Sequence, residues 1–144
     1  RRTIPPPTMA SLNAAEREVC IVRKDKTNTP LQALTLLNNI TFTEAARFLA
    51  ERMMTDSSSG EIGEQIRFGF RLVLCRDPKP IEAAELRELY DKTHDFYGEN
   101  PDQAKQLLSV GERPRNANLD LATHAALTFV ATTLFNLDET ISIE

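Results

Sequence analysis

Helix-start signals recur along the chain from residue 29 onwards, and they constrain its fold more than any other feature. A capping box pairs a polar cap residue with Glu or Gln three positions later, and proline suits the first helical position. Thr29–Gln32 and Asn100–Gln103 combine a cap residue, a proline and a glutamine. Thr41–Glu44 and Ser58–Glu61 follow the capping-box pattern, and Asp120 is a further cap residue. Each of these signals predicts the start of a helix.

Apolar residues repeat behind these signals at the spacing of helices with one buried face. The segment Asp77–Pro80 interrupts the pattern before a further helix, and the helix after Asp120 is apolar on nearly all sides. We therefore expect that last helix to run through the middle of the molecule. The predicted buried stripes are Phe42, Ala45, Ala46, Leu49 and Met53; Ile62, Ile66, Phe70 and Val73; and Leu86, Leu89, Tyr90, Thr93, Phe96 and Tyr97. The sequence predicts an all-α fold, an irregular or orthogonal bundle of five to six helices over residues 30–144.

The first 29 residues have a different character and predict an extended N-terminal arm. Pro5, Pro6 and Pro7 each fix φ and remove an amide donor, which favours an extended start. The short β-branched run Val19–Val22 also favours extended chain. The arm is either a linker, a strap across the helices, or a docking segment for structure upstream. Residues 1–29 carry a net charge of +3 and the remainder −7, so we expect the two parts to attract one another.

Composition excludes several classes of function. The net charge of −4 is unfavourable for a nucleic-acid-binding surface, which requires an excess of Lys and Arg. No stretch approaches the roughly 20 apolar residues of a membrane-spanning helix. The chain begins at Arg1-Arg2 without an initiator Met, so the sequence is interpreted as a domain fragment or a processed product.

No recognised catalytic, cofactor or metal motif is present, so we assign no residue to any of these roles. Cys20 and Cys75 match neither a CxxC nor a CxxCH pattern, and they are interpreted as chance thiols or as a disulfide pair in an oxidising compartment. His94 is predicted to be partly exposed, and His124 falls in the first turn of the last helix. The adjacent acids Asp138–Glu139 follow the most apolar helix and are predicted to form hydrogen bonds at its end.

Four ordered segments resemble the planctomycete-specific domain of unknown function found at the C-terminal end of large proteins that often carry cytochrome-c-like modules. The first is Val22-Arg23 with Thr27–Leu34 and Leu36–Asn38. The others are Phe70–Leu74 followed by Arg76 and Pro78, then Leu107–Glu112, and finally Leu134–Ile141. Where the family pattern tends to have glycine after the third helix, this chain has Cys75.

The resemblance implies context rather than a reaction. It implies an exported, extracytoplasmic multidomain protein in which c-type haem is bound elsewhere, since this chain lacks CxxCH. The leading interpretation is a structural or interaction module whose partners are upstream domains of the same protein. The alternative is the helical part of an oxidoreductase or polysaccharide-processing enzyme whose active site lies mainly upstream. In either case the motif residues of interest are Arg23, Asn28, Thr29, Gln32, Asn38, Asn136, Asp138 and Glu139, with an ion pair predicted between Arg23 and Asp138 or Glu139.

Overall fold

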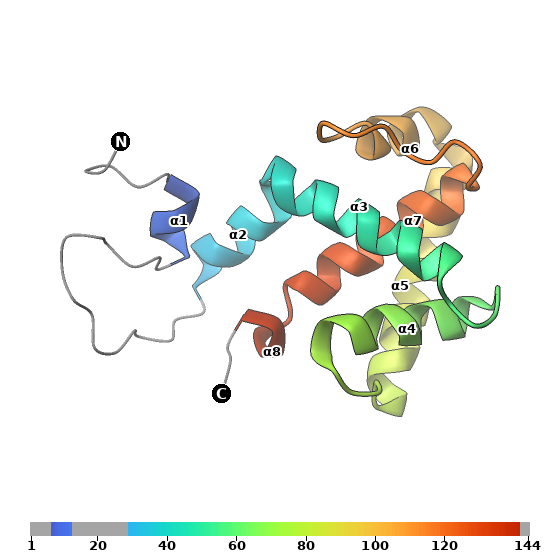
Figure 1. Cartoon of the computed structure of the whole chain (residues 1–144), viewed down its shortest axis with the longest axis horizontal. Helices are drawn as coiled ribbons and strands as arrows, with labels where there is room; N and C mark the ends of the chain where they lie inside the picture. Colours follow the sequence, from blue (N-terminus) through green and yellow to red (C-terminus); the bar gives the residue numbers. More distant parts are fainter. Residues whose placement is uncertain (1–6, 13–28, 142–144) are drawn as a thin grey trace.

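Helices make up most of the described chain. The computed structural model describes residues 7–12 and 29–141, and these residues form eight helices and no strand (Figure 1). The helices are α1 (Pro7–Ser11), α2 (Pro30–Asn38), α3 (Ile40–Thr55), α4 (Ile62–Leu74), α5 (Pro80–Glu99), α6 (Pro101–Leu108), α7 (Leu121–Phe135) and α8 (Asp138–Ile141). The predicted all-α class is confirmed. The six helices α2–α7 have eight or more residues each, whereas the short helices α1 and α8 were not predicted.

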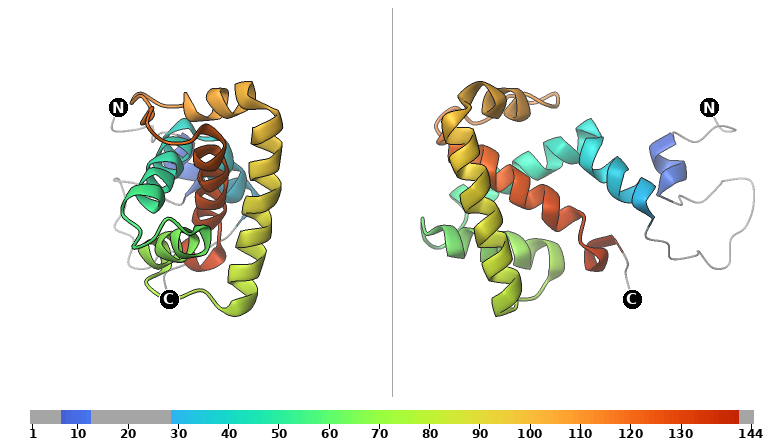
Figure 2. Two further views of the ribbon diagram at one scale, coloured as in Figure 1. Left: turned by 90° about the vertical axis from the view of Figure 1, so that its right-hand side faces the viewer. Right: turned by 180° about the vertical axis from the view of Figure 1, so that it is seen from behind.

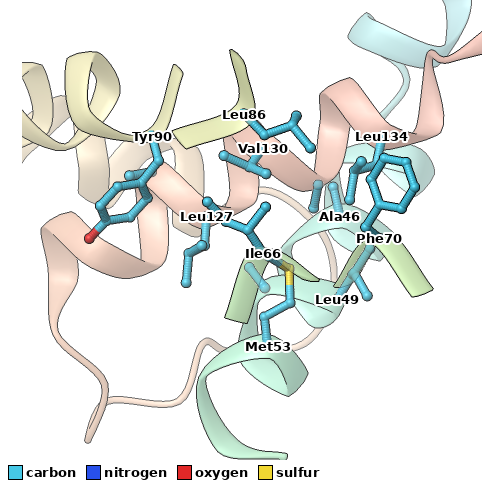
Figure 3. Packing of buried hydrophobic residues seen from close by; sticks show 13 residues of the cluster. Ala46, Leu49, Met53, Ile66, Phe70, Leu86, Tyr90, Leu127, Val130 and Leu134 are labelled. Atoms are coloured by element: carbon cyan, nitrogen blue, oxygen red, sulfur yellow. The ribbon is translucent and has the colours of Figure 1, made fainter. Parts of the chain in front are cut away.

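Helix α7 lies in the middle of the bundle, as its apolar sequence predicts. Eight of its residues are buried, and α3, α4, α5 and α6 all pack against it (Figure 2). The main core joins α7 to the buried faces of α3, α4 and α5, and its labelled members include Met53, Phe70, Tyr90 and Leu127 (Figure 3). Most residues of the predicted stripes belong to this core or pack against it, whereas Ala45 and Phe96 are exposed. Tyr97 packs against a second cluster formed by Ala104, Leu108 and Ala125.

Small residues allow α3 and α4 to approach their neighbours closely. Ala46, Ala50, Ala126 and Ala131 have no exposed surface. On α4, a Cβ added at Gly69 would lie 2.6 Å from the sulfur of Met53 on α3. The packing at this contact therefore depends on the absence of a side chain.

Two of the predicted helix starts are confirmed in atomic detail. The Thr29 hydroxyl accepts a hydrogen bond from the Gln32 amide, and the Gln32 side chain accepts one from the Thr29 amide at 2.8 Å. The Asp120 carboxylate accepts a bond from the Thr123 amide at 2.9 Å and caps α7. Asn100 stands at the cap position of α6, although its side chain makes no capping bond.

Two other predicted capping boxes are wrong. Asn39 is the cap of α3 and its side chain accepts from the Thr41 amide, so Thr41 lies inside the helix. Asn39 also closes α2, which leaves no room for a separate loop between the two helices. Helix α4 begins one turn later than predicted, with Glu61 rather than Ser58 at its cap position. In the loop before α4, the Ser59 hydroxyl instead accepts a hydrogen bond from the Glu61 amide.

The arm is not wholly extended, because α1 forms at its third proline. Pro7 occupies the first helical position, where a missing amide is tolerated, and the next four residues contain no proline. The turn is tied to the bundle by the Asn39 side chain, which donates to the Thr8 hydroxyl at 3.2 Å. Val19–Val22 and the other residues of 13–28 lie outside the described part of the chain.

Candidate functional site

Arg76 connects three helices through two carboxylates. Its guanidinium donates to both oxygens of Glu82 at 2.8 Å and to both oxygens of Glu139 at 2.8 and 2.6 Å. It also lies over the ring of Phe70, with its central carbon 4.8 Å from the ring centre. We call Arg76, Glu82 and Glu139 the Arg76 cluster. It joins the residue after the α4 cap to the first turns of α5 and α8.

The hydrogen bonds of the Arg76 cluster favour its charged state. Bonds from Arg76 and from the Lys79 amide lower the pKa of Glu82 to about 2. A hydrogen bond from Arg76 also lowers the pKa of Glu139, and the pKa of Arg76 itself is raised by both partners. These acids therefore remain ionised near neutral pH and act as fixed acceptors rather than as proton donors.

The residue before Arg76 ends helix α4 in an uncommon backbone conformation. Cys75 caps the C-terminus of α4 in the left-handed conformation, with φ of 55°. Glycine takes this conformation without a Cβ penalty, so a residue with a side chain is strained there. The Cys75 thiol is exposed, and Cys20 lies outside the described residues.

A second polar group, in the interior, fastens the loop between α6 and α7 to α3. Arg47 has no exposed surface, and its guanidinium donates to the carbonyls of Leu108 and Arg113 at 3.2 and 2.6 Å. One Glu44 oxygen accepts hydrogen bonds from the backbone amides of Glu112 and Arg113, at 3.1 and 3.0 Å. Glu44 and Arg47, with Glu51 of α3 and His124 of α7, form a group that we call the α3 anchor.

The other half of the α3 anchor is formed by His124 and Glu51. His124 is fully buried in α7, and its Nε2 lies 3.3 Å from the Arg47 carbonyl and 3.8 Å from a Glu51 oxygen. Burial lowers the pKa of His124, because the charged imidazolium is disfavoured away from water. The same Glu51 oxygen accepts the Asn116 amide at 3.1 Å. The α3 anchor therefore holds the loop at Glu112, Arg113 and Asn116.

The sequence reasoning missed both polar groups, although it contained partial signals for them. Arg47 interrupts the apolar stripe of α3, and a charged residue in such a stripe indicates a buried partner. Its partners are backbone carbonyls more than 60 positions away, and no sequence pattern marks them. Glu82 is one of several acidic residues on α5 and no sequence pattern distinguishes it, although it lies half-buried against Arg76.

Several of the predicted motif residues make hydrogen bonds at different helix ends. Asn38 donates to the Leu34 carbonyl at 2.9 Å and Asn136 to the Thr132 carbonyl at 3.2 Å. Glu139 binds Arg76 in the first turn of α8, where Asp138 is exposed. Arg23 and Asn28 lie outside the described residues, so the pairing of Arg23 with either acid stays a prediction.

The described residues contain neither a candidate metal site nor a candidate membrane-spanning helix. Over residues 7–12 and 29–141, no three His, Cys, Asp or Glu side chains gather closely enough to hold a metal ion. No helix in the same ranges combines the length and apolar character needed to cross a bilayer. A surface hollow of 440 Å³ beside α4 is lined by charged side chains such as Glu64 and Arg67, which already pair with one another at 3.6 Å.

Comparison with known proteins places the chain in a family. The model of the PSD1 family, described as a protein of unknown function (DUF1553), matches residues 1–90. No curated protein and no solved structure matches the chain. The matched residues contain Arg76 and Glu82, together with the first two of the four resembling segments, and the other two follow the match. This chain therefore belongs to the PSD1 family of proteins of unknown function.

Proposed function

We propose that this chain is a structural and interaction module of an exported multidomain protein, and that any reactive centre and c-type haem of that protein are held outside it. The proposal rests on the hydrogen bonds that the motif side chains make. Thr29, Gln32, Asn136 and Glu139 all form bonds within the chain at helix ends. Groups held in this way stabilise a fold and are poorly placed to turn toward a substrate.

Export and haem association rest on the family resemblance alone. The upstream domains of the same polypeptide are the expected partners, and an extracytoplasmic location follows from the same context. The competing role is that of a helical unit completing the active site of an oxidoreductase or polysaccharide-processing enzyme. That role requires a side chain of this chain to contact the reacting atoms.

The two roles are separated by adding the purified chain to the remainder of its polypeptide, expressed separately. A structural module binds the remainder and raises its melting temperature. Glu139→Gln then lowers the melting temperature of the complex without a specific loss of turnover. An active-site role predicts the opposite pattern, in which Glu139→Gln abolishes turnover while binding and melting temperature are unchanged. Failure of the chain to bind the remainder contradicts the proposal.

A further inference from the structure

Helix α2 presents a row of apolar side chains to solvent. Leu31, Leu34 and Leu37 are 61%, 56% and 48% exposed, and Ile40 at the start of α3 is 65% exposed. Met9 on the adjacent helix α1 is 55% exposed. We call these five residues the α2 face. The opposite side of α2 packs inward through Gln32 and Leu36, and the described residues leave this row exposed.

The α2 face is a local concentration of exposed apolar residues. The other large apolar side chains exposed in the described residues are Leu72 on α4, Ile81 and Phe96 on α5, and Phe129 on α7. The five residues of the α2 face instead belong to consecutive helices at one end of the molecule, where α1 and α2 extend away from the bundle (Figure 1). Exposed apolar residues that gather on neighbouring helices mark an interaction site more often than residues that are scattered singly.

Charge distribution identifies the partner that this face fits. No charged residue occurs from Thr27 to Thr43, although 26% of the chain is charged. Helix α1 also contains no charged residue. A two-fold symmetric contact brings the same patch of both subunits together, so a charge near the axis faces its own copy and a patch of one sign repels itself. The α2 face avoids that repulsion because it contains no charged residue.

We propose that the α2 face is the interface between two copies of this chain. This inference deepens the proposed interaction role by naming one partner. The partner matches the face because it presents an equally uncharged, apolar row. Burying five half-exposed side chains on each of two copies removes on the order of 1,000 Å² of surface, which is the lower limit for a specific interface. The expected dimer is therefore weak and forms mainly at high protein concentration.

Sedimentation equilibrium of the 144-residue chain over a range of concentrations tests the proposal. The unchanged chain is expected to form dimers, and Leu34→Glu is expected to weaken dimerisation at least about tenfold, because it places two carboxylates in the apolar contact. Ile81→Glu is the matched control, since Ile81 is also highly exposed but lies on α5, and this variant should dimerise normally. Circular dichroism and melting temperature establish that both variants are folded.

Salt dependence adds an independent readout. Dimerisation through an uncharged face is expected to persist at high salt, whereas a contact between charged surfaces weakens as salt rises. A chain that stays monomeric at every concentration contradicts the proposal, as does a dimer unaffected by Leu34→Glu. A monomer that still binds the rest of its polypeptide overturns this inference and leaves the proposed function standing. A chain that dimerises but does not bind the rest of its polypeptide overturns the proposed function instead.

Discussion

His124 shows at the scale of one residue how burial sets the response of the fold to pH. Its imidazole faces Glu51 and the Arg47 carbonyl from α3, with Arg115 of the loop also nearby, and burial lowers its pKa below the ordinary 6.5. The unfolded chain therefore binds a proton more readily than the folded chain does. The contribution of His124 to stability is complete above pH 6.5 and is lost as the pH falls toward the folded pKa.

This linkage predicts that acidification weakens the fold before the carboxylates titrate. Urea unfolding should give a lower free energy of unfolding at about pH 5.5 than at about pH 7.5. His124→Gln retains a polar side chain and cannot titrate, so its stability should change less between the two conditions. An equal loss in both proteins would show that another group is responsible.

At the scale of helices, the contact between α3 and α4 depends on Gly69. Gly69→Ala places a methyl group against the side chain of Met53. Because Met53 is fully buried, its side chain cannot swing out into solvent to make room. We expect this variant to be destabilised by about 1–3 kcal/mol, as in other overpacked cores. Gly98→Ala on α5 is the control, because a Cβ there meets nothing within 4 Å. It should be neutral or stabilising by up to about 1 kcal/mol. Chemical denaturation measures both, and equal effects would contradict the packing account.

Arg47 makes a separate prediction for the loop between α6 and α7. Arg47→Met leaves the carbonyls of Leu108 and Arg113 without their guanidinium donor and removes a partner of Glu44. Removing one side of a buried ionic network lowers stability by about 3–5 kcal/mol. Amide hydrogen exchange should also show faster exchange at Glu112 and Arg113. Arg52→Met, at an exposed ion pair on the same helix, should change stability by no more than about 1 kcal/mol.

Sequence patterns predicted the elements better than the contacts between them. The cap at Asp120 and the apolar surface of α7 are local properties, so the start and the burial of that helix could both be predicted. The cap at Asn39 could not, because Thr41 and Glu44 fit the same pattern and only the joined geometry of α2 and α3 decides between them. The polar groups around Arg76 and Arg47 depend on tertiary contacts across more than 60 positions, to which helical periodicity gives no access.

At the scale of the whole molecule, the Arg76 cluster closes the fold between residues far apart in sequence. Arg76 and Glu82 hold the junction of α4 and α5, and Glu139 ties α8 to that junction. Glu139 belongs to the closing segment of the family resemblance, and its bonds to Arg76 give it a role in the fold. This role predicts that Arg76 and Glu139 are energetically coupled.

A double-mutant cycle on Arg76 and Glu139 measures this coupling. Arg76→Met, Glu139→Gln and the double variant are compared with the parent by urea unfolding near neutral pH, where the lowered pKa keeps Glu139 ionised. Arg87→Met and Asp91→Asn provide a control cycle on an exposed pair within one helix, whose coupling should be close to zero. We expect each single variant in the Arg76 cluster to have a lower free energy of unfolding than the parent. The loss in the double variant should be clearly smaller than the sum of the two single losses. Additive losses, or single variants as stable as the parent, would contradict the assignment of Glu139 to the fold.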